Sequence, residues 1–156
     1  NSQFDRSVNW KDVEWLISQW DGPFVIKGVS SVADAVKARD IGASAIMISN
    51  HGGRQLDSAP APVDLVAPMR EAVGDKIELI VDGGIRRGTH IIKALALGAN
   101  ACSIGRSYLY GRAAGGEAGV DRVITLLSAE VERSLGLMGC SHVSGLGHNH
   151  IQPTSG

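Results

Sequence analysis

Four short apolar runs constrain the fold of this chain more than any other feature of its sequence. They occupy residues 24–26, 45–48, 77–81 and 101–104, and each precedes a segment with helical periodicity. Strands that alternate with helices form a parallel sheet, which is either doubly wound or part of an eight-stranded barrel. A complete barrel needs about 250 residues. The 156 residues of this chain therefore predict an α/β fold that is about half of a TIM barrel.

The segments between the runs carry the end signals of helices. Asn9 followed by Asp12, and Ser31 followed by Asp34, are typical of capped N-termini. Helices are predicted over residues 10–20, 32–41, 63–73, 89–97 and 120–137. Trp15, Leu16 and Trp20 of the first helix are expected to pack into a core, since apolar residues at helical spacing usually do.

Composition excludes several classes of protein. The chain is 44% hydrophobic and 20% charged, with a formal net charge of -1, so it has no basic footprint for nucleic acid. No apolar run has the length of a membrane span, and two cysteines make no disulfide framework. Cys102 lies in an apolar run and is expected to be buried and inert. We expect one domain over residues 1–156 and a reducing, cytoplasmic setting.

The tail, residues 139–156, is short of core residues but contains three histidines. His142, His148 and His150 have spacings that match no closed zinc site, and no cysteine pair or acidic ligand set accompanies them. No metal site is predicted, and a mobile tail is the expected structure.

The second apolar run leads directly into Ser49-Asn50-His51-Gly52-Gly53-Arg54. Two glycines allow a sharp turn at the end of the strand, which would present His51 and Arg54 together. An imidazole titrates near neutral pH, and a guanidinium matches a carboxylate in geometry. The pair suggests a base beside a clamp for a small organic acid, although a single histidine after a strand is more often an ordinary loop residue.

The other three runs also end in residues that suit a site. Lys27 closes the first run, and the last two runs end in glycines and arginines: Asp82, Gly83, Gly84, Ile85 and Arg86, then Gly105 and Arg106. Parallel strands bring these ends to one face. Glycines allow backbone N–H groups to approach an anion, and arginine adds a bidentate contact. A phosphate site is therefore predicted there.

These motifs, together with Ile26-Lys27-Gly28, Lys93-Ala94-Leu95-Ala96-Leu97-Gly98-Ala99 and the continuation Gln55-Leu56-Asp57, resemble one family over nearly the whole chain. The likeness is to the C-terminal half, strands 5–8, of the FMN-dependent 2-hydroxy-acid dehydrogenases and oxidases. That family includes glycolate oxidase, L-lactate dehydrogenase and mandelate dehydrogenase.

The resemblance implies FMN as the cofactor and a role for each matching position. Lys27 would lie against the N1/O2 edge of the flavin, and Ser49 would hydrogen-bond the ring. His51 would take a proton from the substrate, and Arg54 would bind its carboxylate. The ribityl chain and phosphate would be held by Asp82, Gly83, Gly84, Ile85, Arg86, Gly105 and Arg106.

The resemblance also implies what this half does not supply. The family's first four strands provide the aspartate partner of the histidine, a substrate-binding tyrosine and further flavin contacts. The chain alone is therefore expected to be inactive or nearly so, and to need an N-terminal half-barrel segment from the same protein, a separate chain or a second copy. A homo-oligomer and a cytoplasmic or peripheral inner-membrane location are also expected.

Two alternatives remain open from the sequence. The chain could be a half-barrel that binds phosphate or flavin, or serves in assembly, without turnover. It could also belong to a phosphate-binding barrel enzyme that uses no flavin, although the pairing of His51 with Arg54 suits a hydroxy acid better than a sugar phosphate.

Overall fold

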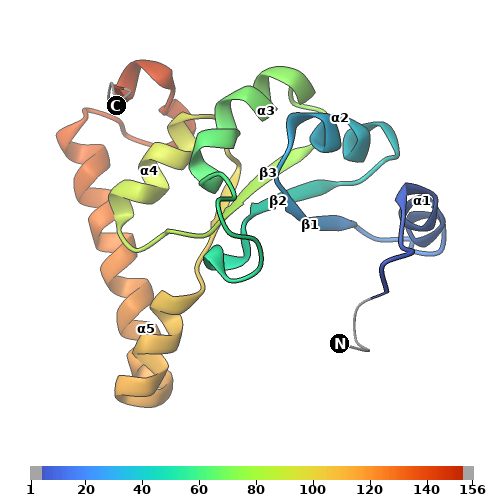
Figure 1. Ribbon diagram of the computed structural model, residues 1–156. Helices are drawn as coiled ribbons and strands as arrows, with labels where there is room; N and C mark the ends of the chain where they lie inside the picture. The colour runs from blue at the N-terminus through green and yellow to red at the C-terminus, as the bar shows by residue number, and fades with distance from the viewer. Residues whose placement is uncertain (1–4, 153–156) are drawn as a thin grey trace.

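A computed structural model describes residues 5–152 of the chain. It contains one parallel sheet, with helices packed on one of its faces and a long helix beyond its last strand (Figure 1). The elements, in chain order, are α1 (Trp10–Ser18), β1 (Val25–Val29), α2 (Val32–Asp40), β2 (Ala45–Ser49), α3 (Val66–Val73), β3 (Glu78–Asp82), α4 (Gly88–Ala96), β4 (Ala101–Ser103) and α5 (Arg106–Leu137).

The sheet order is β1-β2-β3-β4, and each neighbouring pair is parallel. This confirms the predicted α/β architecture. Ser49 pairs with Asp82, and Asp82 pairs with Ser103, so three polar residues lie side by side at the carboxyl ends of their strands.

Strand β1 differs from the sequence prediction. Lys27 does not close the strand but lies inside it, opposite Met47, and the pairing register shifts between Lys27 and Val29. Gly28 forms this bulge, with φ of +93°. A bulge bends a strand and redirects its side chains. The strand can therefore continue beyond Lys27, although a lysine after an apolar run predicts the end of a strand.

Side chains alternate between the two faces of the sheet. Ile46, Ile48, Leu79 and Val81 are fully buried on the face that α2, α3 and α4 cover. The next residues along the strands, Ser49 and Asp82, face the other side, as the period of two requires. The helix-covered face forms the core, and the opposite face carries the candidate site.

Helix α1 starts as predicted, with a capping box between Asn9 and Asp12. The three residues predicted to pack into the core do not do so, however. The helix ends at Ser18, the side chains of Trp15 and Trp20 are each 61% exposed, and Leu16 is also exposed. Trp10 and Ile17 pack partly against the core instead, with the Lys37 ammonium over the Trp10 ring, so one side of α1 contacts the rest of the chain.

Helix α5 is longer than predicted, because it begins at Arg106 rather than at residue 120. Gly115 and Gly116 have non-helical backbone angles and divide it into two arms. The arms approach closely: a Cβ atom on Gly111 would lie 2.5 Å from the carbonyl oxygen of Gly119. No helix was predicted over the glycine-rich segment 111–119, whose glycines in fact allow two helical arms to pack together.

The tail is ordered up to residue 152 by local hydrogen bonds, and residues 153–156 lie outside the described residues. Two short 3₁₀ turns, Val143–Gly145 and His148–His150, follow α5. His150 accepts the N–H of Gly147 and lies 3.2 Å from the sulfur of Cys140. The described part of the tail therefore makes contacts within itself, and its mobility stays a prediction.

Candidate active site

The turn after β2 has an unusual backbone. His51, Gly52 and Gly53 all have positive φ angles, of 55°, 69° and 73°. Glycine adopts this region freely, but a histidine there is strained. The Ser49 hydroxyl accepts the N–H of His51 at 3.1 Å, and the Asn50 side chain accepts the N–H of Gly52 at 3.1 Å. Backbone strain of this kind clusters at functional sites.

Strand β1 leaves space for the histidine ring. A Cβ atom on Gly28 would lie 3.1 Å from Cε1 of His51. The bulge in β1 therefore brings a residue without a side chain against the ring. The sequence motif Ile26-Lys27-Gly28 did not reveal this contact of Gly28 with the His51 ring, although a glycine inside an apolar strand is a signal of close approach.

Asp82 joins three strands through its carboxylate. It lies 3.3 Å from the Lys27 ammonium and accepts the Ser49 hydroxyl at 2.6 Å. Burial raises the pKa of Asp82, but hydrogen bonds from Ser49 and Ser103 and the charge of Lys27 outweigh it and leave this pKa below its ordinary value of 3.8. The carboxylate is therefore ionised at neutral pH, beside an ammonium that is half exposed and retains donors for a ligand.

The loop between β3 and α4 is held from two helices. We call Gly83, Gly84, Ile85 and Arg86 the glycine loop; its two glycines have φ of 119° and 77°. The Ser107 hydroxyl donates to the Ile85 carbonyl at 3.0 Å, and the Nδ1 atom of His90 lies 3.0 Å from the Gly84 carbonyl oxygen.

The predicted residues converge on one cavity of about 220 Å³. All but one of them line it: Lys27, His51, Arg54, Asp82, Gly83, Gly84, Ile85, Arg86, Gly105 and Arg106. Ser49 is buried beneath, where it supports Asp82 and the turn. The structure thus brings an amine, an imidazole and three guanidinium groups to a single rim.

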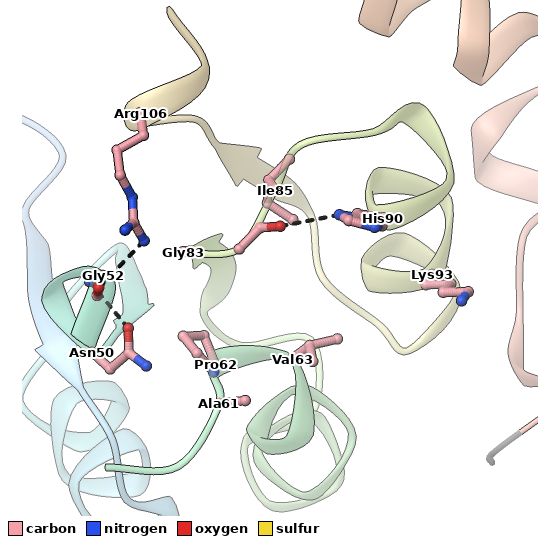
Figure 2. A pocket seen from close by; sticks show the side chains of 11 residues that line it. Asn50, Gly52, Ala61, Pro62, Val63, Gly83, Ile85, His90, Lys93 and Arg106 are labelled. Carbon is pink, nitrogen blue, oxygen red and sulfur yellow. Dashed lines mark hydrogen bonds between the residues drawn. The ribbon is translucent and has the colours of Figure 1, made fainter. Parts of the chain in front are cut away.

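A second cavity of about 390 Å³ adjoins the first (Figure 2). It lies between the glycine loop and residues 61–63, with His90 and Lys93 of α4 on its wall. Arg106 borders both cavities, and its guanidinium donates to the Gly52 carbonyl at 3.3 Å. Gly83, Gly84 and Ile85 of the glycine loop thus line both cavities.

The comparisons with known proteins agree on one family. The sequence matches the FMN-dependent dehydrogenase family over residues 1–153. The chain belongs to the FMN-dependent dehydrogenase family. Membership confirms the resemblance, and the family's cofactor is FMN.

Several members of the FMN-dependent dehydrogenase family have 45–50% identity to this chain. A peroxisomal (S)-2-hydroxyacid oxidase of Arabidopsis thaliana is 46% identical over 96% of the chain, and an L-lactate oxidase of Nostoc sp. is 50% identical over 90%. A pre-mycofactocin synthase of Mycolicibacterium smegmatis is 50% identical over 88%. The chain spans 41%, 39% and 34% of their respective lengths.

Solved structures of the family confirm the fold. A soluble mutant of the membrane-associated (S)-mandelate dehydrogenase from Pseudomonas putida has a TM-score of 0.93 and 43% identity to this chain. The match covers 97% of the chain and 43% of the dehydrogenase. The four strands are therefore part of a TIM barrel.

The residues of the first cavity fit a flavin phosphate. A Cβ atom on Gly84 or Gly105 would meet no atom within 4 Å, so the backbone at both positions faces open space that a ligand could occupy. Arg86 and Arg106 line the same cavity and match a phosphate in charge and geometry. Within residues 5–152, no cluster of three or more histidine, cysteine, aspartate or glutamate residues suits a metal ion.

Sequence reasoning missed residues whose roles depend on tertiary contacts. Ser103, His90 and Ser107 support Asp82 or the glycine loop from neighbouring elements. None of them lies in a motif with chemistry of its own. The pairing of Ser103 with Asp82 follows from the sheet register, which could have been anticipated from the position of the serine at a strand end.

Proposed function

We propose that this chain is the catalytic part of an FMN-dependent enzyme that oxidises an L-2-hydroxy acid to the 2-oxo acid. The observation that carries the proposal is the shared cavity, in which His51 and Arg54 lie beside Lys27, Asp82 and Arg106. A base and a carboxylate clamp thus border the same space as the groups suited to a flavin. Hydroxy-acid oxidases among the relatives support this substrate class.

Two residues of the turn act on the substrate. Arg54 binds the substrate carboxylate through its planar fork of donors, which orients the hydroxyl-bearing carbon. His51 takes a proton from the substrate, and the open space at Gly28 allows its ring to reach the cavity. FMN, when bound, would supply the redox chemistry, taking up the two electrons and the remaining proton of the oxidation.

The remaining residues bind the cofactor. The Lys27 ammonium, half exposed at the cavity, would face the N1/O2 edge of a bound flavin and stabilise negative charge there. Ser49 would act on the flavin from beneath, because its hydroxyl donates to the Asp82 carboxylate and fixes it. Asp82 would accept hydrogen bonds from the ribityl hydroxyls, and the glycine loop, Gly105 and Arg106 would hold the phosphate.

A segment outside this chain completes the barrel. The His51 ring has no hydrogen-bond partner among residues 5–152, although an orienting carboxylate is what such a base requires. Strands β1 and β4 are open edges of the sheet. We propose that an N-terminal half-barrel segment supplies the carboxylate and pairs with both edges, and that the completed protein is a homo-oligomer.

The test compares the full chain with a chimera in which the N-terminal part of (S)-mandelate dehydrogenase precedes it. We expect the chimera to bind FMN and to be reduced by an L-2-hydroxy acid under anaerobic mixing. His51→Gln should leave the chimera loaded with flavin while slowing reduction by at least about a hundredfold, the scale of a general base. His148→Leu, in the tail, is the control.

The outcomes separate the proposal from its alternatives. Reduction of the His51→Gln flavin at the unmodified rate would refute the role of His51. A chimera that binds FMN but is reduced by no hydroxy acid would favour a binding or assembly module. Binding of inorganic phosphate without any flavin would point instead to a barrel enzyme that uses no flavin.

The location of the protein is also a proposal. No helix within residues 5–152 is long and apolar enough to cross a membrane. One solved relative is described as a monotopic membrane protein. We propose a cytoplasmic protein, with peripheral attachment to the inner membrane as the alternative, and cell fractionation at low and high salt distinguishes the two.

A further inference from the structure

A single ring on helix α4 touches the backbone of the glycine loop at two points. The Nδ1 atom of His90 accepts the N–H of Arg86 at 3.3 Å. The same atom lies 3.0 Å from the carbonyl oxygen of Gly84, the contact drawn as a dashed line in Figure 2. One ring nitrogen can accept from the N–H or, in the other tautomer, donate to the carbonyl. In either state the ring connects the loop to the first turn of α4.

The helix itself does not depend on this ring for its cap. The side chain of Glu130, on α5, accepts the Gly88 N–H at 2.7 Å and pairs with the Arg87 guanidinium at 3.0 Å. Glu130 therefore caps α4 by accepting a free backbone N–H group at its start. In a capping box, a side chain at the third position of the helix itself makes a hydrogen bond at the helix start. His90 occupies that third position but contacts the loop instead.

The loop needs anchors, because glycine has wide conformational freedom. Gly83 and Gly84 both have positive φ, and a free loop of this composition would lose entropy each time it bound a ligand. Ser107 fixes the loop from α5 through the Ile85 carbonyl. His90 fixes it from α4, on the side of the larger cavity.

We propose that His90 is a positioning residue that holds the glycine loop in the conformation that binds the phosphate of FMN. The inference rests on the proposed function, because it assumes that this loop receives the phosphate. The ring acts through the backbone of Gly84 and Arg86 and need not touch the cofactor. Its removal should therefore weaken the binding of the phosphate and of no other part of the flavin.

Comparison of FMN with riboflavin isolates that effect, since the two differ only in the phosphate. Dissociation constants for both are measured by flavin fluorescence, in the full chain and again in the chimera. His90→Leu should raise the constant for FMN about three- to tenfold, the scale of one hydrogen bond, and leave that for riboflavin unchanged. His90→Asn should restore FMN binding, because an amide keeps both an acceptor and a donor.

Two controls guard against a general loss of structure. His148→Leu, a matched change at an exposed tail histidine, should alter neither constant, and His90→Ala provides a second deletion if the leucine variant does not fold. Equal weakening of FMN and riboflavin would assign His90 a purely structural role and overturn the inference. The inference would also be overturned if His90→Leu and His90→Ala left the dissociation constant for FMN unchanged in a chain that binds FMN more tightly than riboflavin. A native chain with no preference for FMN would overturn the proposed phosphate site itself.

Discussion

Asp82 brings together most of the electrostatics of the candidate site. Its carboxylate accepts the Ser49 hydroxyl and pairs with the Lys27 ammonium, and its side chain is only 13% exposed. A charge buried to this degree stays ionised only because its partners compensate for lost hydration. The low pKa of Asp82 is therefore a property of all four strands together.

That arrangement predicts a pH-dependent contribution to stability. Because the pKa of Asp82 is lowered in the folded chain, its interactions contribute fully above the unfolded value and are lost as pH falls through the folded value. Asp82→Asn should lower the free energy of unfolding by about 1–3 kcal/mol at neutral pH. The difference from the native chain should shrink in acid, as measured by urea denaturation across pH.

Asp64→Asn, at an exposed carboxyl group, is the control and should change stability little at any pH. A gap between the native chain and the Asp82→Asn variant that stayed constant into strong acid would show that the carboxylate contributes through packing rather than through charge.

Helices α4 and α5 are joined at one very close contact. A Cβ atom on Gly88 would lie 2.5 Å from Cβ of Glu130 and 2.6 Å from the backbone nitrogen of Val131. The approach lets Glu130 cap α4, and its hydrogen bonds from the Gly88 backbone and from Arg87 hold the pKa of this glutamate below its ordinary value.

Gly88→Ala should therefore destabilise the chain, by about 1–3 kcal/mol as an overpacked contact does. The two helices would have to separate, which would also weaken the Glu130 cap. Thermal or urea unfolding measures the loss. Gly136→Ala is the matched control in α5, where a Cβ meets nothing within 4 Å, and it should be neutral or slightly stabilising.

The elements differ in how far the sequence could predict them. Strands β2 and β3 were predictable because their buried residues are almost all apolar, and the caps at Asn9 and Ser31 follow local chemistry. The first arm of α5 was not predictable, because glycines disfavour a helix in the absence of other contacts. The contact between Gly111 and Gly119 that explains them is visible only in the structure. His90 and Glu130 were missed for the same reason: their partners lie on other elements.

At the scale of the whole molecule, several apolar side chains in and after α1, and at the start of β1, lack a cover within the described chain. Trp15 and Trp20 are each 61% exposed and Val25 is 44% exposed, and in Figure 1 α1 lies beyond the β1 edge of the sheet. The motifs could place the site at one rim because parallel strands end together. They could not supply the remaining walls of the site, which we propose an N-terminal half-barrel segment adds.

Completion of the barrel should therefore change the tryptophan fluorescence. In the full chain, emission from Trp15 and Trp20 should resemble that of exposed indoles, and in the chimera it should shift to shorter wavelength as these rings are buried. A chimera carrying Trp15→Phe and Trp20→Phe retains only Trp10 of this chain's own tryptophans, which is already half buried. After subtraction of the emission of the added segment, it should show no such shift. An unchanged spectrum in the unsubstituted chimera would mean that the added segment does not cover α1.

The shared carboxylate also has an evolutionary consequence. A lineage that replaced Lys27 by a neutral residue while keeping Asp82 would leave a buried anion with one fewer partner, which is costly. Residues 27 and 82 should therefore covary. Among descendants of this sequence, a change at residue 27 should be accompanied by a change at residue 82.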